Sequence, residues 1–284
     1  MVDIAIVGAG PAGLSAAVNA AARNKSVLVI GRAKETSALW KAERVANHLG
    51  ANGQSGAEIM EAYTAHAQAL GIEIRTGRVL QIMPIGKMFA LNTGKDIIEA
   101  KAVILATGVQ KGKTLAGEEE YLGKGVSYCA TCDGMLYRGK DVVVIGEIAE
   151  ADEEASFLAE VCASVRYFPL YGAPGRLHEA IQVMEGKPEA VLGEGTVTGV
   201  RVNGEVIPCG GVFMSKAAAP PDSLVFGLQT EGGAVVINRL GETNVSGVFA
   251  CGDCTGWPHQ LSKAVGEGLA AAQQAARFLD ADKA

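Results

Sequence analysis

The chain has 284 residues, with 25 lysines and arginines against 31 aspartates and glutamates, and a formal net charge of -6. This acidic balance argues against a nucleic-acid-binding protein, and no run of 18 or more apolar residues predicts a membrane-spanning helix. The length allows two domains of about 150 residues each. Six cysteines in a chain this long do not make a disulfide scaffold, and the strand pattern starting at Val2 has no basic leader before it. We therefore expect a cytoplasmic protein in which any disulfide is catalytic.

A glycine-rich turn follows the first predicted strand. Residues 2–7 form a short apolar run, the next six read Gly-Ala-Gly-Pro-Ala-Gly, and an alanine-rich helix is expected over 14–23. Gly8 permits the tight turn, Gly10 lets a pyrophosphate approach the backbone, and Gly13 lets helix and strand pack closely. The phosphates would rest on the helix N-terminus. Between a strand and a helix, this pattern favours a dinucleotide site over a turn without a ligand.

The second predicted strand, over residues 26–30, departs from the usual pattern at its end. An acidic residue is expected there to bind ribose hydroxyls, but the chain has Gly31 and Arg32. Either backbone groups and Arg32 hold the adenosine end, or the ribose is held less tightly. This weakens the case for NAD(H) more than the case for FAD, because FAD makes many other contacts.

The rest of the first predicted fold leads to a buried strand over residues 101–108. That strand ends in Ala106-Thr107-Gly108, and a parallel strand ending in glycine lets a cofactor lie against its carboxyl end. Before it we expect a helix over 56–70, strands over 72–75 and 78–83, and a β-ribbon over 87–92 and 96–99.

Two thiols separated by two residues, Cys129 and Cys132, are followed directly by Asp133. We expect Cys132 and Asp133 at or near a helix N-terminus, where unpaired N–H groups and partial positive charge favour thiolate. Thiolate is the form that attacks a disulfide, and Asp133 is placed to move a proton to or from the sulfurs. The alternatives are half a zinc site or two buried structural cysteines. A zinc site needs a second ligand pair, and the histidines have no metal-ligand spacing.

A second strand–turn–helix unit carries a broken fingerprint. The strand over 141–146 ends at Gly146, but Ile148 stands at the second glycine position, where its Cβ would block a pyrophosphate. Glu147 and Glu150 add negative charge, unless they only cap the helix dipole and point to solvent. The helix over 149–162 and strand over 165–168 lead to no basic cluster for a 2′-phosphate. We expect a dinucleotide fold that has lost NADPH.

The last segment returns to the first fold. A strand over 243–250 precedes Cys251-Gly252-Asp253-Cys254, and a helix is expected over 261–280. Asp253 would accept hydrogen bonds from a flavin ribityl chain, and the helix N-terminus would face the flavin pyrimidine edge. His48 and His259 are further candidates to touch flavin. We expect Cys251 and Cys254 to be buried and unreactive, and Cys162 and Cys209 to be small buried hydrophobic residues.

Taken together, these motifs resemble the low-molecular-weight thioredoxin reductases over essentially the whole chain. The matching segments are 8–13, 106–108, 129–134, 247–250 and 252–253, with Gln260. The resemblance implies an α/β fold of two Rossmann-like three-layer domains of the FAD/NAD-linked reductase type, the second inserted in the first. The FAD-binding domain would comprise 1–112 and 242–284, and the CxxC-bearing domain 113–241. It also implies a homodimer that reduces thioredoxin, with Cys132 nearest the flavin, Cys129 attacking thioredoxin and Asp133 as general acid.

We expect FAD to be the cofactor and to contact residues from both parts of its domain. These are Gly8, Gly10, Pro11, Ala12, Gly13, Gly31, Arg32, Asn47, Val79, Ala106, Thr107, Gly108, Gly252, Asp253, His259, Gln260 and Leu261.

Within this family, the chain looks most like the ferredoxin-dependent flavin thioredoxin reductases that lack NADPH-binding motifs. The shared features are Gly31 at the end of the second strand, the Tyr128–Cys132 wording, the Glu-rich second turn and the phrase over 252–256. The implied reaction passes single electrons from reduced ferredoxin through FAD to the Cys129–Cys132 pair. The alternatives are a flavin-dependent dithiol oxidase that uses oxygen, an NADPH-dependent reductase with an atypical site, and a non-catalytic flavoprotein that docks or senses partners.

Overall fold

A computed structural model describes residues 1–109, 114–216 and 220–281. The chain forms two compact units, residues 1–110 with 220–284 and residues 111–219, which are described separately. The predicted domain boundary at 112/113 lies outside the described residues. The predicted return at residue 242 comes 22 residues after the start of the returning segment at Pro220, because α5 (Pro221–Leu224), β15 (Thr230–Glu231) and β16 (Ala234–Val235) belong to the first unit.

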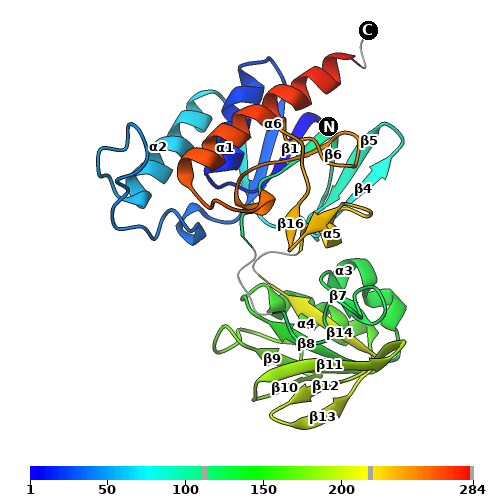
Figure 1. Cartoon of the computed structure of the whole chain (residues 1–284). Coiled ribbons are helices and arrows are strands. Elements are labelled where there is room, and N and C mark those ends of the chain that lie inside the picture. The colour runs from blue at the N-terminus through cyan, green and yellow to red at the C-terminus, as the bar shows by residue number, and fades with distance from the viewer. Residues whose placement is uncertain (110–113, 217–219, 282–284) are drawn as a thin grey trace. The chain divides into compact units, whose positions relative to one another are not determined.

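A seven-stranded sheet forms the centre of the first unit (Figure 1). Strand β1 (Val2–Val7) pairs in parallel with β2 (Val27–Gly31) and with β6 (Ile97–Leu105). The remaining strands are β3 (Glu73–Thr76) and β17 (Val248–Ala250), which are parallel to their neighbours, and β4 (Gln81–Ile85) and β5 (Met88–Asn92), which are antiparallel. The carboxyl ends of β1 and β6 meet at one edge, since Val7 pairs with Leu105.

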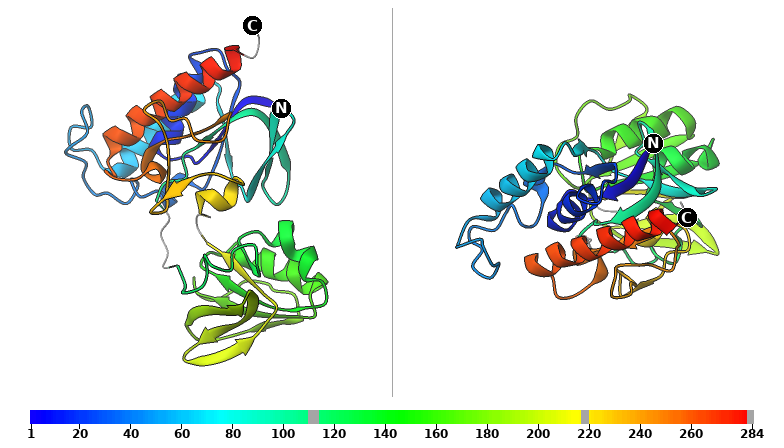
Figure 2. Two further views of the ribbon diagram at one scale, coloured as in Figure 1. Left: turned by 45° about the vertical axis from the view of Figure 1, so that its right-hand side comes forward. Right: turned by 90° about the horizontal axis from the view of Figure 1, so that it is seen from above.

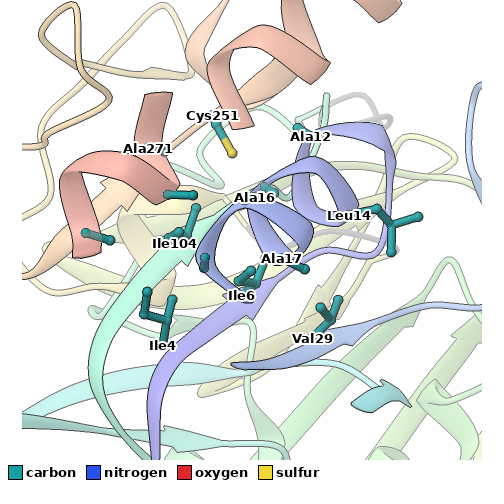
Figure 3. Packing of buried hydrophobic residues seen from close by; sticks show 14 of the residues in the cluster. Ile4, Ile6, Ala12, Leu14, Ala16, Ala17, Val29, Ile104, Cys251 and Ala271 are labelled. Carbon is teal, nitrogen blue, oxygen red and sulfur yellow. The ribbon is translucent and has the colours of Figure 1, made fainter. Parts of the chain in front are cut away.

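Helices α1 (Pro11–Ala21) and α6 (Leu261–Ala281) run side by side over this sheet (Figure 2). Small residues permit the close packing: an added Cβ at Gly268 of α6 would lie 2.3 Å from the Ala12 carbonyl oxygen. Ile4, Ile6 and Ile104 of the strands pack with Ala12, Ala16 and Ala271 of the helices in one apolar core (Figure 3). The first unit also contains α2 (Gly56–Ala69), whose N-terminus has a capping box made by Ser55 and Glu58.

The second unit is built on a five-stranded parallel sheet in the order β10-β9-β8-β14-β7. Its strands are β7 (Val126–Ser127), β8 (Asp141–Gly146), β9 (Ser164–Pro169), β10 (Ile181–Val183) and β14 (Gly211–Ser215). Helices α3 (Ala130–Asp133) and α4 (Ala151–Val161) complete the unit together with an antiparallel sheet of β11 (Pro188–Glu194), β12 (Thr196–Val202) and β13 (Glu205–Pro208). Short 3-10 helices span Lys34–Thr36, Gly134–Tyr137 and Gly252–Thr255.

The predicted α/β fold with parallel sheets is confirmed, and most elements lie within a few residues of their expected bounds. The predicted β-ribbon is present, since β5 pairs antiparallel with the start of β6, but the predicted break before residue 101 is wrong: residues 97–105 form the single nine-residue strand β6. Its first half pairs with β5 and its second half with β1 and β17. Lys101 does not interrupt it, because the side chain is only partly buried and reaches Asp3 at 2.8 Å.

Candidate active site

Cys129 and Cys132 form a disulfide with an S–S distance of 2.00 Å. Cys129 is the N-cap of α3, and its sulfur accepts a hydrogen bond from the Cys132 N–H at 3.1 Å. This places Cys132 and Asp133 in the first turn of a short helix, at the position expected from the sequence. Cys129 is buried, with 6% of its surface exposed, whereas Cys132 is half-buried.

Ser127 connects the disulfide with the neighbouring carboxylate. Its Oγ lies 2.7 Å from Asp133 Oδ2 and accepts a hydrogen bond from the Cys129 N–H at 3.0 Å. The same oxygen is 3.3 Å from the Cys129 carbonyl oxygen. Asp133 is half-buried and donates its own N–H to that carbonyl. The sequence prediction missed Ser127, although its position two residues before Cys129 is a usable signal.

A buried ion pair lies behind the redox-active turn. Lys216 Nζ is 2.6 Å from Glu118 Oε1, and the two residues are 2% and 1% exposed. The same carboxylate oxygen accepts the hydroxyl hydrogen bond of Tyr128, the residue before Cys129, while Oε2 accepts the Leu115 N–H at 2.8 Å. These residues were also missed. A lysine directly after the apolar strand β14 is the one signal for them in the sequence.

The turn after β8 is filled by protein. Ile148 is buried with 6% exposure, and an added Cβ at Gly146 would lie 2.5 Å from the Ala151 Cβ and 2.8 Å from the Tyr167 hydroxyl. Burial raises the pKa of half-buried Glu147; the positive charge of Lys216 lowers it and Glu118 raises it further. This turn therefore presents a buried isoleucine and a carboxyl group where the fingerprint of a pyrophosphate site would have an open glycine.

Asp152 in the first turn of α4 closes the same region. Its carboxylate accepts hydrogen bonds from the hydroxyl groups of Tyr167, at 2.8 Å, and Tyr171, and from the Gly175 N–H at 2.7 Å. These bonds tie the segment after β9 to α4. The residues of this second turn do not fit a pyridine nucleotide, because they provide neither an open glycine turn nor a cation for phosphate.

The glycine turn of the first unit, unlike the turn after β8, is open and carries no acidic side chain. Cβ atoms at Gly8 and Gly13 would lie 2.1 Å from the Ala106 oxygen and 1.9 Å from the Gly8 oxygen, so both glycines are needed for the backbone packing. At Gly10, nothing lies within 4 Å of an added Cβ. The α1 N-terminus has no side-chain cap and no acidic residue in its first turn. An open glycine at an uncapped helix N-terminus fits a cofactor pyrophosphate.

The structure explains why a glycine is needed at position 31, which the sequence alone did not reveal. Its Cβ would lie 2.4 Å from the Ala9 backbone nitrogen, so the end of β2 packs directly on the glycine turn. Arg32, the next residue, is half-buried, and Val79, which lies between β3 and β4, is buried. Ala106, Thr107 and Gly108 follow the end of β6.

Two hydrogen bonds connect the loop before α2 with the start of α6. Asn47 Nδ2 donates to Gln260 Oε1 at 2.8 Å, and His48 Nδ1 lies 3.0 Å from Ser262 Oγ. The other nitrogen of His48 is 2.9 Å from the Tyr63 hydroxyl. The structure thus brings together Asn47 and Gln260, two of the residues expected to contact the cofactor. His259 is exposed and Leu261 begins α6.

The Gly252-Asp253 turn is supported by a polar network that the sequence prediction missed. Glu267 Oε2 accepts the Gly252 N–H at 2.8 Å and contacts Lys263 Nζ at 3.1 Å. Lys263 also donates to the Gly252 carbonyl at 2.9 Å. Burial raises the pKa of half-buried Asp253, while the positive charges of His259 and Lys263 lower it and Glu267 raises it. The spacing of Lys263 and Glu267, one helical turn apart, was the available signal.

The four other cysteines are free thiols. Cys251 and Cys254 are 0% and 3% exposed, and burial raises the pKa of both. Burial likewise raises the pKa of Cys209 to about 11 and that of half-buried Cys162. Among the described residues, no three histidine, cysteine or acidic side chains are grouped to hold a metal ion. No described helix is long and apolar enough to span a membrane.

Comparison with known proteins gives consistent matches. Residues 2–268 match the pyridine nucleotide-disulphide oxidoreductase family. The bifunctional thioredoxin reductase/thioredoxin of Mycobacterium leprae is 35% identical over 98% of this chain, which spans 66% of that protein's length. The thioredoxin reductase of Aquifex aeolicus is 31% identical, with 88% of this chain and 84% of that protein covered. The crystal structure of a ferredoxin-flavin thioredoxin reductase from Clostridium acetobutylicum is 43% identical, with a TM-score of 0.92 and coverage of 99% of this chain and 98% of that one.

Proposed function

Since the chain belongs to the pyridine nucleotide-disulphide oxidoreductase family, and within it to the FAD-containing thioredoxin reductases, we propose that it reduces the thioredoxin disulfide with electrons from reduced ferredoxin. The observation that carries the choice of donor is the filled turn after β8. Buried Ile148 stands at the second glycine position of the fingerprint with half-buried Glu147 before it, and Asp152 holds Tyr171 against α4. The likeness to the Clostridium acetobutylicum ferredoxin-flavin thioredoxin reductase supports the same donor.

The residues of the first unit have assigned tasks in this proposal. The α1 N-terminus with Gly10, Ala12 and Gly13 would bind the FAD pyrophosphate, which favours the positive end of a helix dipole. Asp253 would accept hydrogen bonds from the ribityl hydroxyls, and Lys263 with Glu267 would fix the turn that presents it. When bound, FAD supplies a carrier that takes electrons singly from ferredoxin and passes them on as a pair.

The second unit carries out thiol–disulfide exchange. The Cys129 thiolate attacks one sulfur of the thioredoxin disulfide; that S–S bond breaks, a mixed disulfide forms, and the departing sulfur takes a proton from Asp133. The Cys132 thiol returns a proton to Asp133 and attacks the Cys129 sulfur. The second thioredoxin sulfur leaves and takes that proton, so two electrons and two protons have moved to thioredoxin. The Cys129–Cys132 disulfide is restored.

The geometry of the turn supports two parts of this reaction, the thiolate form of Cys129 and the proton transfer by Asp133. The N-cap position of Cys129 directs the Cys132 N–H at its sulfur at 3.1 Å, which stabilises charge on Cys129. The half-buried Asp133 lies in the same turn of α3 and is held toward Cys129 by Ser127. Burial of Cys129 means that its sulfur reacts in the reduced state only with a partner that docks on this turn.

An anaerobic titration tests the choice of donor. The FAD-loaded protein is mixed first with NADPH and then with photoreduced ferredoxin while the flavin absorption band is followed, and thioredoxin thiols are counted afterwards. We expect ferredoxin to bleach the band and to yield thioredoxin thiols, and NADPH to leave the band unchanged. Stoichiometric bleaching by NADPH would contradict the proposal.

Cysteine variants provide the matched controls. In both C129S and C132S, ferredoxin should still bleach the flavin band. C129S should yield no thioredoxin thiols, whereas C132S should stop at the mixed disulfide and release at most one thiol per enzyme without turnover. C162S removes a cysteine outside the reaction and should behave as wild type. The homodimer implied by the family resemblance is part of the same proposal, and sedimentation of the FAD-loaded protein tests it.

A further inference from the structure

We propose that Ser127 is a positioning residue for thiol–disulfide exchange: its hydroxyl holds Asp133 against Cys129 both when the carboxyl group is ionised and when it carries a proton. This inference rests on the function proposed above. It assigns to a buried hydroxyl group the task of keeping a proton-carrying side chain in place through both halves of the reaction.

The backbone of Ser127 is fixed by the parallel sheet. Ser127 ends β7 and pairs with Phe213 of β14, which is 1% exposed. Ser127 itself is 3% exposed. The redox pair, in contrast, lies on a four-residue helix that follows the strand. A short helix has few hydrogen bonds of its own, so its orientation depends on contacts such as those of the Ser127 hydroxyl.

Three partners surround the Ser127 oxygen. Asp133 Oδ2 lies 2.7 Å away, the Cys129 N–H donates over 3.0 Å, and the Cys129 carbonyl oxygen lies 3.3 Å away. A serine hydroxyl group has one donor and two acceptor positions. With Asp133 ionised, the hydroxyl donates to Oδ2 and accepts from Cys129 N–H.

When Asp133 carries its proton, the direction of one bond reverses. Asp133 then donates to the Ser127 oxygen, which still accepts from the Cys129 N–H, and the hydroxyl hydrogen turns to the Cys129 carbonyl. All three positions are used, and no backbone atom has to move. The arrangement therefore keeps the Asp133 carboxyl group connected through Ser127 to the Cys129 backbone in both protonation states, and an alanine at position 127 loses this connection.

Single-turnover kinetics test the inference without an electron donor protein. The FAD-loaded protein is reduced with stoichiometric dithionite and mixed anaerobically with oxidised thioredoxin. S127A is expected to slow thioredoxin reduction about tenfold or more, the effect of removing one hydrogen bond to a charged group. S127T keeps the hydroxyl group and should recover most of the rate. S215A, which removes a buried serine hydroxyl on β14, is the control and should react as wild type.

A double-mutant cycle, in which the effect of S127A on the rate is measured in the wild-type and the D133N protein, separates positioning from a purely structural role. If Ser127 acts through Asp133, S127A should slow the D133N protein less than about twofold, because the coupling partner is already lost. An equal loss in both backgrounds, or a wild-type rate in S127A, would overturn the inference. FAD content and circular dichroism confirm that each variant is folded. If the reduced wild-type protein itself leaves thioredoxin oxidised, the proposed function fails, which is a different outcome.

Discussion

Replacing Glu118 by glutamine is expected to destabilise the second unit by about 3–5 kcal/mol, because it removes the carboxylate that is in direct contact with the buried Lys216 ammonium group. Both side chains are almost fully inaccessible, at 1% and 2% exposure. Glutamine also creates a donor mismatch. One Glu118 oxygen accepts the Leu115 N–H and the other accepts Lys216 and Tyr128, so the amide NH2 group faces a donor in either orientation.

Hydrogen exchange followed by mass spectrometry measures this loss where it occurs. Trp40 and Trp257 are the two tryptophans, and both lie in the first unit, so their fluorescence does not report on the second. Peptides that cover β8 and β14 report on it directly. A loss of about 3 kcal/mol or more accelerates their exchange at least about a hundredfold, since about 1.4 kcal/mol corresponds to a factor of ten.

An exposed pair is the matched control. Glu73 and Arg75 are in contact at 2.8 Å, with side chains 61% and 41% exposed. E73Q should change the exchange of β3 peptides by less than about fivefold, the effect of a surface ion pair worth under about 1 kcal/mol. If E118Q left β8 and β14 exchanging as slowly as in the wild type, the reasoning on the buried charge would be refuted.

Three further predictions concern acidity, thiols and glycines. Burial raises the pKa of Glu147 above its ordinary value of 4.5. The folded protein is therefore most stable with respect to this group at pH values below 4.5, and this stability is lost as the pH rises through the raised pKa. E147Q should therefore resist urea better than the wild type at neutral pH and equally at about pH 4; a less stable E147Q at neutral pH would contradict this. In the reduced native protein, iodoacetamide should modify half-buried Cys132 before the buried Cys251 and Cys254, as mapped by mass spectrometry, and early labelling of the latter two would be the opposite result. G10A should keep the thermal midpoint of the FAD-free protein but lower FAD content, whereas G13A should lower both, because only the second added Cβ meets backbone.

Local patterns predicted the elements that carry the chemistry. The first glycine turn was recognisable because each glycine has a separate steric task, and Gly8 and Gly13 do meet backbone at about 2 Å when a Cβ is added. The CxxC turn was recognisable because adjacent thiols and a carboxylate occupy one helical turn. The isoleucine at the second glycine position was equally visible, and it is buried in the structure.

The contacts that the sequence prediction missed are long-range. Glu118 and Lys216 are separated by 98 residues, and no local periodicity connects them. The start of the returning segment was missed because α5, β15 and β16 have four residues or fewer, too short for a hydrophobic pattern. β6 was divided into two because a lysine and a change of pairing partner occur within one continuous strand.

Under the proposed function, the three hydrogen bonds on the Asp152 carboxylate would limit how readily this protein could change its electron source. A glycine in place of Ile148 would empty an apolar position without releasing Tyr171, and loss of Asp152 would remove a hydrogen-bond acceptor from buried Tyr167 and half-buried Tyr171 without opening the turn. Each single step therefore costs stability and yields no nucleotide pocket. Under the same proposal, a change of donor to a nicotinamide nucleotide would need several substitutions together, because each one alone destabilises the second unit.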